Sequence, residues 1–121
     1  MAKIFLDANI FIDFVEKRGI NIEDKLGQHN LVVSPLSIHI LIYITKKKIP
    51  NEKLLNIINL FLIVDFNKVI SEKALHGPTS DFEDNVQLHC AAAAECDYFL
   101  TNDKGLLKTK FFGKTQIINN L

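Results

Sequence analysis

Carboxylates follow two short apolar segments of this chain, and a third acidic group precedes a segment of small residues. Asp7 comes directly after the apolar residues 4–6, and Asp103 closes the polar group that follows residues 98–100. The third group has the spacing of a helix start: Asp81, Glu83 and Asp84. Carboxylate oxygens are the ligands that hard divalent ions such as Mg²⁺ and Mn²⁺ prefer. If folding brings these acids together, they can support metal-assisted chemistry.

The acids at 81–84 also have a purely structural interpretation. Asp81 stands three residues before another acid and just before an apolar run, which is typical of a capped helix start. A cap needs no metal. The carboxylate at residue 7 is harder to explain in this way, because it ends a second apolar segment. For Asp81 and Asp84, capping and metal binding therefore both stay open.

Composition predicts one domain over residues 1–121, since 48% of the residues are hydrophobic and 23% are charged, enough for a packed core. The longest apolar run, 31–45, is too short and too polar to span a bilayer, and the amino terminus lacks the pattern of a signal peptide. We expect a cytoplasmic protein without a membrane anchor. The formal net charge of zero excludes nucleic-acid binding by bulk charge but not by local lysine clusters. Cys90 and Cys96 are expected to be buried fillers.

Apolar runs predict five strands, at residues 4–6, 31–33, 63–66, 98–100 and 115–118. Helices are predicted at residues 10–19, 22–27 with Asn21 as cap, 38–44, 50–62, 69–76 and onward from 81. Residues 38–44 alternate with a period of two, as in a strand, but Ser34-Pro35 before them and three lysines after them favour a helix. Strands separated by helices imply a three-layer α/β/α sandwich with a mostly parallel, about five-stranded sheet.

On such a sheet the strands present their carboxyl ends at one edge, where ligands usually bind. We therefore expect Asp7, Asp84 and Asp103 to meet there. Two carboxylates about 4 Å apart repel by roughly 4 kcal/mol at an effective dielectric of 20, so three of them need a cation. A bound Mg²⁺ or Mn²⁺ suits phosphodiester hydrolysis, because it polarises the phosphoryl oxygen and lowers the pKa of a bound water. The sequence has no P-loop, HExxH, CxxC or GxSxG motif, which excludes the commonest competing enzyme classes.

The chain resembles a PIN domain, the fold of many prokaryotic ribonucleases, including the toxin half of VapBC-type toxin–antitoxin pairs. Three segments carry the resemblance: IFLDANIFID, SPLSIHIL and DFEDNVQLHCAAAAECDYFLTNDKGL. The resemblance implies that three acids bind the metal and catalyse the reaction: Asp7, Asp84 and Asp103. It also implies supporting residues: Asn9, Ser37, Asp81 and Thr101. It further implies a five-stranded parallel sheet, Mg²⁺ or Mn²⁺, RNA as substrate, an antitoxin partner and a homodimer.

One position departs from the family pattern. The family's second acid is a glutamate three residues beyond a serine or threonine, which places it at Ile40, given Ser37. Isoleucine cannot bind a metal, and His39 is turned away from that position by about 100° on a helix. Two functions therefore stay open. One is a metal-dependent ribonuclease, with Lys104 as the first candidate for gripping RNA. The other is a catalytically weak or inactive PIN-like module that binds RNA or a partner protein.

Overall fold

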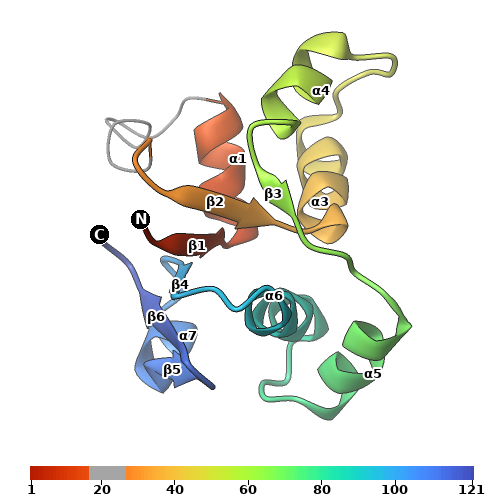
Figure 1. The fold of residues 1–121 in the computed structure, drawn as a ribbon. Coiled ribbons are helices and arrows are strands. Elements are labelled where there is room, and N and C mark those ends of the chain that lie inside the picture. Colours follow the sequence, from red (N-terminus) through yellow and green to blue (C-terminus); the bar gives the residue numbers. More distant parts are fainter. Residues whose placement is uncertain (17–26) are drawn as a thin grey trace.

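A mixed sheet of six strands forms the middle layer of the computed structural model, which describes residues 1–16 and 27–121 (Figure 1). The strands are β1 (Lys3–Leu6), β2 (Asn30–Val33), β3 (Leu62–Ile63), β4 (Tyr98–Leu100), β5 (Phe111–Phe112) and β6 (Thr115–Ile118). Their order is β3-β2-β1-β4-β6-β5, and every pair is parallel except β5 with β6. The strand order reverses between β1 and β4. Open α/β sheets bind their ligands at such a switch point.

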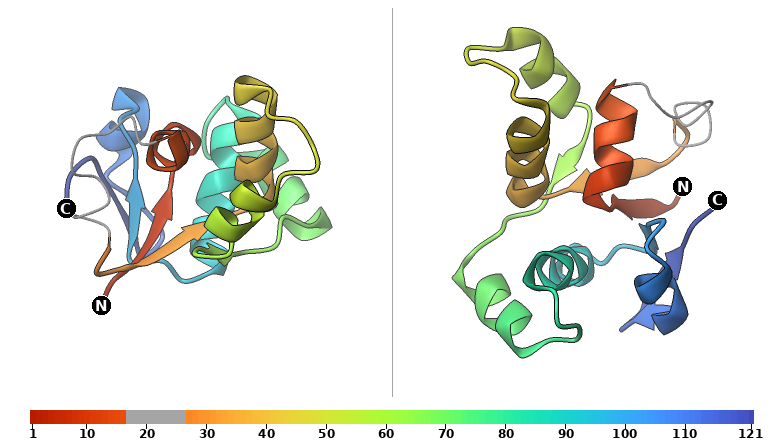
Figure 2. Two further views of the ribbon diagram at one scale, coloured as in Figure 1. Left: turned by 90° about the horizontal axis from the view of Figure 1, so that it is seen from above. Right: turned by 180° about the vertical axis from the view of Figure 1, so that it is seen from behind.

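Helices cover both faces of the sheet. They are α1 (Ala8–Glu16), α3 (Pro35–Thr45), α4 (Glu52–Ile58), α5 (Lys68–His76), α6 (Phe82–Ala93) and α7 (Lys104–Thr109). Figure 1 shows α1, α3 and α4 on one side and α5 and α6 on the other, and the view from behind in Figure 2 shows the same separation. The predicted three-layer sandwich with a mostly parallel sheet is confirmed. The short antiparallel strand β5 is an addition to it.

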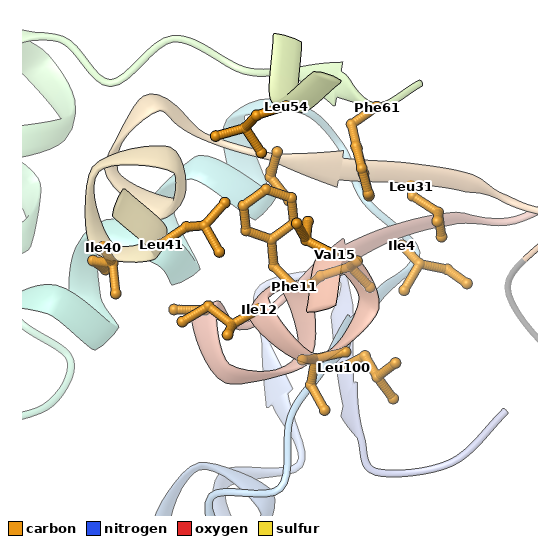
Figure 3. Close-up of a cluster of buried hydrophobic side chains, with 14 residues drawn as sticks. Ile4, Phe11, Ile12, Val15, Leu31, Ile40, Leu41, Leu54, Phe61 and Leu100 are labelled. Atoms are coloured by element: carbon orange, nitrogen blue, oxygen red, sulfur yellow. The ribbon is translucent and has the colours of Figure 1, made fainter. Parts of the chain in front are cut away.

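Successive side chains of the central strands enter two different cores, as the pleat of a strand requires. In β1, Ile4 and Leu6 pack with α1, α3 and α4, whereas Phe5 packs with α5, α6 and α7. Figure 3 shows the first of these clusters, with Phe11 of α1 in its midst. In the second cluster Phe5 stacks on Phe99, with ring centroids 5.5 Å apart. Apolar burial on both faces therefore holds β1 and β4 side by side.

The segment with the ambiguous period is a helix, as predicted. Ser34 is the N-cap of α3, Pro35 occupies its first turn, and Lys46 ends it in the left-handed conformation (φ 55°). Ile40 and Leu41 are buried, while Tyr43 and Ile44 face solvent. Apolar residues thus occur on both the buried and the exposed sides of α3, which explains why its sequence lacks the usual helical period.

The boundary between α4 and β3 was predicted incorrectly. The helix ends at Ile58 instead of continuing to Leu62, and the strand covers residues 62–63 instead of 63–66. Phe61 turns inward and packs edge-on against Phe11 and Phe14, at centroid distances of 5.2 Å in both cases. Burying this ring ends the helix and delivers the next residues to the edge of β2.

Other predictions have mixed outcomes. The end of α1 at Gly19 and nearly all of the helix predicted at 22–27 lie outside the described residues. The sequence did not predict α7 or β5. Cys90 and Cys96 are buried free thiols, as expected, and burial raises their pKa values to about 11 and about 12. No helix in the described ranges has the length and apolarity to cross a membrane. A single domain over residues 1–121 stays a prediction.

Candidate active site

A cavity of about 260 Å³ opens beside the switch point between β1 and β4. Its lining comes from the ends of β1 and β4, the first turn of α6 and one side of α3: Asp7, Ala8, Asn9, Ile40, Ile44, Glu83, Asp84, Asn102 and Asp103. The structure thus brings the three predicted acids and Asn9 to one cavity. The lining contains four carboxylates and, among the described residues, no lysine or arginine. This excess of negative charge is the main chemical property of the site.

Asp7 is held by the register of the two central strands. Leu6 lies opposite Leu100, so the next residues along, Asp7 and Thr101, are neighbours. The Thr101 hydroxyl donates to Asp7 Oδ2 at 2.6 Å, and the Ala8 N–H donates to Oδ1 at 2.7 Å. Burial raises the pKa of Asp7, these hydrogen bonds lower it, and the charge of Asp103 raises it. The net effect is a raised pKa of Asp7, so ionising this carboxyl without a compensating positive charge costs free energy.

Asp103 has two functions in the structure. It is the N-cap of α7, where its Oδ1 accepts from the Leu106 N–H at 3.0 Å, and it also lines the cavity. Its own N–H donates to the Thr101 hydroxyl at 3.0 Å, so Thr101 links it to Asp7. Gly105 leaves room for the cap, because a Cβ there would approach Oδ1 to 3.1 Å. Thr101 therefore fixes both strand-end acids at once.

The acids at 81–84 have different surroundings in the structure. Asp81 is the N-cap of α6, and its Oδ1 accepts from the Asp84 N–H at 2.9 Å. Asp84 instead directs its carboxylate into the cavity lining. Burial, followed by the charges of Asp81, Asp7, Asp103 and Glu83, raises the pKa of Asp84 to about 6. Burial, Asp81 and Asp7 also raise the pKa of Glu83. The capping hypothesis is thus correct for Asp81 and does not account for Asp84.

Gln87 is a supporting residue that the sequence reasoning missed. It lies almost one helical turn beyond Asp84 on α6 and is 1% exposed. Its Oε1 accepts from the Ala8 N–H at 2.9 Å, the same N–H that donates to Asp7 Oδ1. Residues three apart on a helix lie on the same face. The signal that could have found it is therefore a polar amide three residues after Asp84 within a segment expected to be buried.

The remaining predicted residues lie around the cavity rather than in it. Ser37 is fully buried at the start of α3, where its Oγ accepts from the Ser34 N–H at 3.5 Å. Lys104 is exposed at the beginning of α7 and does not line the cavity. His39 is also exposed and outside the lining, whereas Ile40 is buried and lines it. The apolar side chain of Ile40 therefore faces the acids.

The donor set matches a hard divalent cation in chemistry but is not closed around one. Its oxygen atoms come from carboxylates and amides, the ligands of Mg²⁺ and Mn²⁺. Within the part of the chain that the structure describes, no three side chains of Asp, Glu, His or Cys are grouped as a metal cluster. Burial first, and the charges of the neighbouring acids second, raise the pKa values of Asp7 and Asp84, and the repulsion between these charges opposes a tight arrangement. A cation would remove that repulsion.

Comparisons with known proteins identify a matching family model and similar solved structures. A family model described as a PIN domain matches residues 3–105. No curated protein matches the chain. Among solved structures, the chain is similar to VapBC2 from Rickettsia felis bound to a DNA fragment from its promoter, with a TM-score of 0.66, 17% identity and coverage of 96% of this chain and 97% of that chain. It is likewise similar to DNA-bound VapBC from Salmonella typhimurium, with a TM-score of 0.66, 16% identity and coverage of 98% of both chains. At these identities the likeness concerns the fold.

Proposed function

Because the chain belongs to the PIN-domain family, whose members are generally nucleases, we propose that it is a divalent-metal-dependent endoribonuclease. The observation that carries the proposal is the cavity at the β1–β4 switch point, which four carboxylates line and in which the pKa of Asp84 rises to about 6. Perturbed acids in a cleft are typical of functional sites. Asp7, Asp84 and Asp103 would hold Mg²⁺ or Mn²⁺ and carry the catalysis.

When bound, such an ion supplies Lewis-acid polarisation of a phosphoryl oxygen. The chain's own residues prepare the site for it. Thr101 orients the Asp7 carboxylate through a hydrogen bond, and Gln87 holds the Ala8 N–H that also donates to this carboxylate. The pKa of Asp84 is raised to about 6, and a nearby positive charge would lower it and favour the ionised form. The amides of Asn9 and Asn102 lie in the cavity lining, where they can donate to phosphate oxygens.

The proposal is tested by titrating the purified protein with Mg²⁺ and Mn²⁺ while following thermal unfolding, and by cleavage assays on single-stranded and structured RNA. Asp7→Asn should abolish the metal-induced stabilisation and the cleavage. It should preserve or raise the metal-free melting temperature, because it removes a buried charge. Asp65→Asn, at an exposed position after β3, is the matched control. Cleavage that persists in EDTA or in Asp7→Asn would contradict the proposal.

The second candidate is a PIN-like module that binds RNA or a partner protein with little or no turnover. Ile40 favours it, because this side chain lines the cavity at the position where the family has its second acid. Without this carboxylate, water must fill the free ligand positions of a bound metal ion. A loss of about 1.4 kcal/mol in binding free energy lowers the affinity for the ion tenfold.

Ile40→Glu distinguishes the two candidates. It should tighten metal binding and increase cleavage if the missing acid limits an otherwise competent nuclease. His39→Ala should change metal binding little, because His39 is exposed and outside the lining. Loss of metal binding in His39→Ala together with no effect of Ile40→Glu would show that histidine has taken the glutamate's place. An Ile40→Glu variant that binds metal tightly and still fails to cleave RNA would favour the second candidate.

The proposed partners of this protein are a small antitoxin protein and a second copy of this chain. The similar solved structures are described as VapBC assemblies on DNA, which supports a toxin–antitoxin pair by analogy of fold. Exposed apolar residues at the edge of the sheet supply a surface that a partner would cover: Leu60, Leu62 and Ile63. Co-purification with the product of a neighbouring gene and the molar mass in solution test both partners. The cytoplasmic location stays a prediction.

A further inference from the structure

The exposed side of α3 carries two aromatic rings and a lysine that lie close together, here called the α3 platform: His39, Tyr43 and Lys46. The rings of His39 and Tyr43 are nearly parallel, with an interplanar angle of 14° and centroids 6.4 Å apart. Lys46 Nζ lies 5.5 Å from the centroid of the Tyr43 ring. Tyr43 is nevertheless 70% exposed. The platform is thus ordered by neighbouring side chains and still open to solvent.

The α3 platform lies on the helix that supplies one side of the acidic cavity. Ile40 and Ile44, which line the cavity, each come one residue after a platform residue. Successive residues on a helix are rotated by about 100°, so the stripe of His39 and Tyr43 runs beside the stripe of Ile40 and Ile44. Figure 3 shows Ile40 on α3 at the margin of the buried cluster. A chain molecule with one unit in the cavity can therefore lay the next unit on the platform.

The charge of this surface complements a nucleic acid. Lys46 ends α3 with its backbone N–H donating to the Ile42 carbonyl at 2.8 Å, which fixes the point from which its side chain reaches Tyr43. Lys47 is engaged by Glu16 at 3.0 Å, whereas Lys48 is exposed. The platform thus combines an exposed aromatic face with lysine charge. Proteins that bind single-stranded nucleic acids use this combination, in which bases stack on aromatic rings and cations meet the phosphates.

We propose that the α3 platform stacks an unpaired nucleobase next to the phosphodiester held in the cavity, with Tyr43 as the residue that positions this base. The proposal rests on the proposed nuclease function and deepens it. Bases inside an RNA duplex are stacked on one another and leave no free face for Tyr43. A protein partner is a poorer match for this surface, because it would have to desolvate the lysine and histidine beside the ring.

The test is a binding measurement with Ca²⁺ in place of Mg²⁺ and Mn²⁺, so that a hard cation offsets the carboxylates of the cavity. Gel electrophoresis after the measurement shows whether the RNA is intact, so that cleavage does not contribute. The probes are a short single-stranded oligoribonucleotide and an RNA duplex of the same composition. Tyr43→Ala should weaken single-strand binding about tenfold, which is about 1.4 kcal/mol and within the range for one stacked base. Tyr43→Phe keeps the ring and should retain the affinity. Phe111→Ala removes another exposed aromatic residue, on β5 at the far edge of the sheet, and should leave binding unchanged.

Intrinsic fluorescence gives an independent readout, because the chain has two tyrosines and no tryptophan. Stacking of a base on Tyr43 should quench the tyrosine emission of the wild-type protein when RNA binds. In Tyr43→Phe only the partly buried Tyr98 is left, and its emission should stay constant when RNA binds. Unchanged single-strand affinity in Tyr43→Ala would overturn the proposal, as would an equal loss for the duplex. A change in oligomeric mass with unchanged RNA affinity would also overturn it, in favour of a protein interface. Tyr43-dependent binding without cleavage in any metal would uphold the platform and refute the nuclease.

Discussion

Replacing Asp84 by asparagine should reveal the electrostatic cost of the acidic cavity. Burial and four neighbouring acids raise the pKa of Asp84 from an ordinary 3.8 to about 6. Because the pKa of Asp84 is higher in the folded than in the unfolded protein, the contribution of Asp84 to stability is fully present below about pH 3.8. This contribution is lost as the pH rises through about 6. A shift of this size would correspond to about 3 kcal/mol for a fully buried group. Asp84 is partly exposed, so solvent screening reduces the effect to about 1 kcal/mol.

The assay is urea unfolding in EDTA between about pH 4 and about pH 8. Asp84→Asn should flatten the pH dependence and should be more stable than the wild type by about 1 kcal/mol above pH 6, with little difference near pH 4. Asp84 lies in the first turn of α6, where the helix terminus favours a negative charge by about 0.3–1 kcal/mol. The raised pKa means that burial and the neighbouring acids outweigh this benefit. Asp65→Asn should shift stability little at any pH.

The opposite result at high pH would refute this reasoning. If Asp84→Asn were less stable than the wild type near pH 8 in EDTA, the carboxylate would be net favourable in the folded protein. Millimolar Mg²⁺ supplies a second check. It should stabilise the wild type above about pH 6, where Asp84 is ionised, and much less near pH 4, where protons compete for the same oxygens.

Two further predictions concern the surroundings of the cavity. Thr101→Val removes the hydroxyl that donates to Asp7 and accepts from the Asp103 N–H. It should therefore lower the free energy of unfolding, measured in urea, by about 1–3 kcal/mol. The control Thr109→Val, at the exposed end of α7, should not lower it. Lys104→Ala should remove one phosphate contact, so the slope of log K against log salt for single-stranded RNA should become shallower by about 0.7, with Lys73→Ala on α5 as the unchanged control. A slope identical to that of the wild type would exclude Lys104 from the contact.

Local sequence signals were sufficient wherever a boundary depends on chemistry within one turn. Ser34 and Pro35 predicted the start of α3 correctly, although the period of residues 38–44 is that of a strand. The cap is a local hydrogen-bonding and φ preference, so it does not depend on the rest of the fold. The period failed as a signal because α3 is apolar on its exposed side as well.

Tertiary packing decided the boundaries that local signals placed incorrectly. Leu62 continues the helical spacing of α4, but Phe61 is drawn into the core between Phe11 and Phe14, and the chain then pairs with β2. The partner rings lie far away in the sequence, so no pattern within 50–62 reports them. The strand β5 escaped prediction for a similar reason, since two residues form a strand only because β6 is beside them.

The candidate site was likewise determined in part by the sequence and in part only by the tertiary structure. The sequence alone predicted that Asp7 and Asp103 each follow a strand of a mostly parallel sheet, whose strand ends share one edge. Only the tertiary structure decided that these two strands are neighbours. Only the tertiary structure decided that Asp81 caps α6 while Asp84 faces the cavity, and that Gln87 reaches the Ala8 N–H. The physical reason is that strand ends are set by chain connectivity and hydrogen-bond register. The direction in which a helical side chain points depends instead on the rotation of α6 against the sheet, which the packing of its buried residues determines.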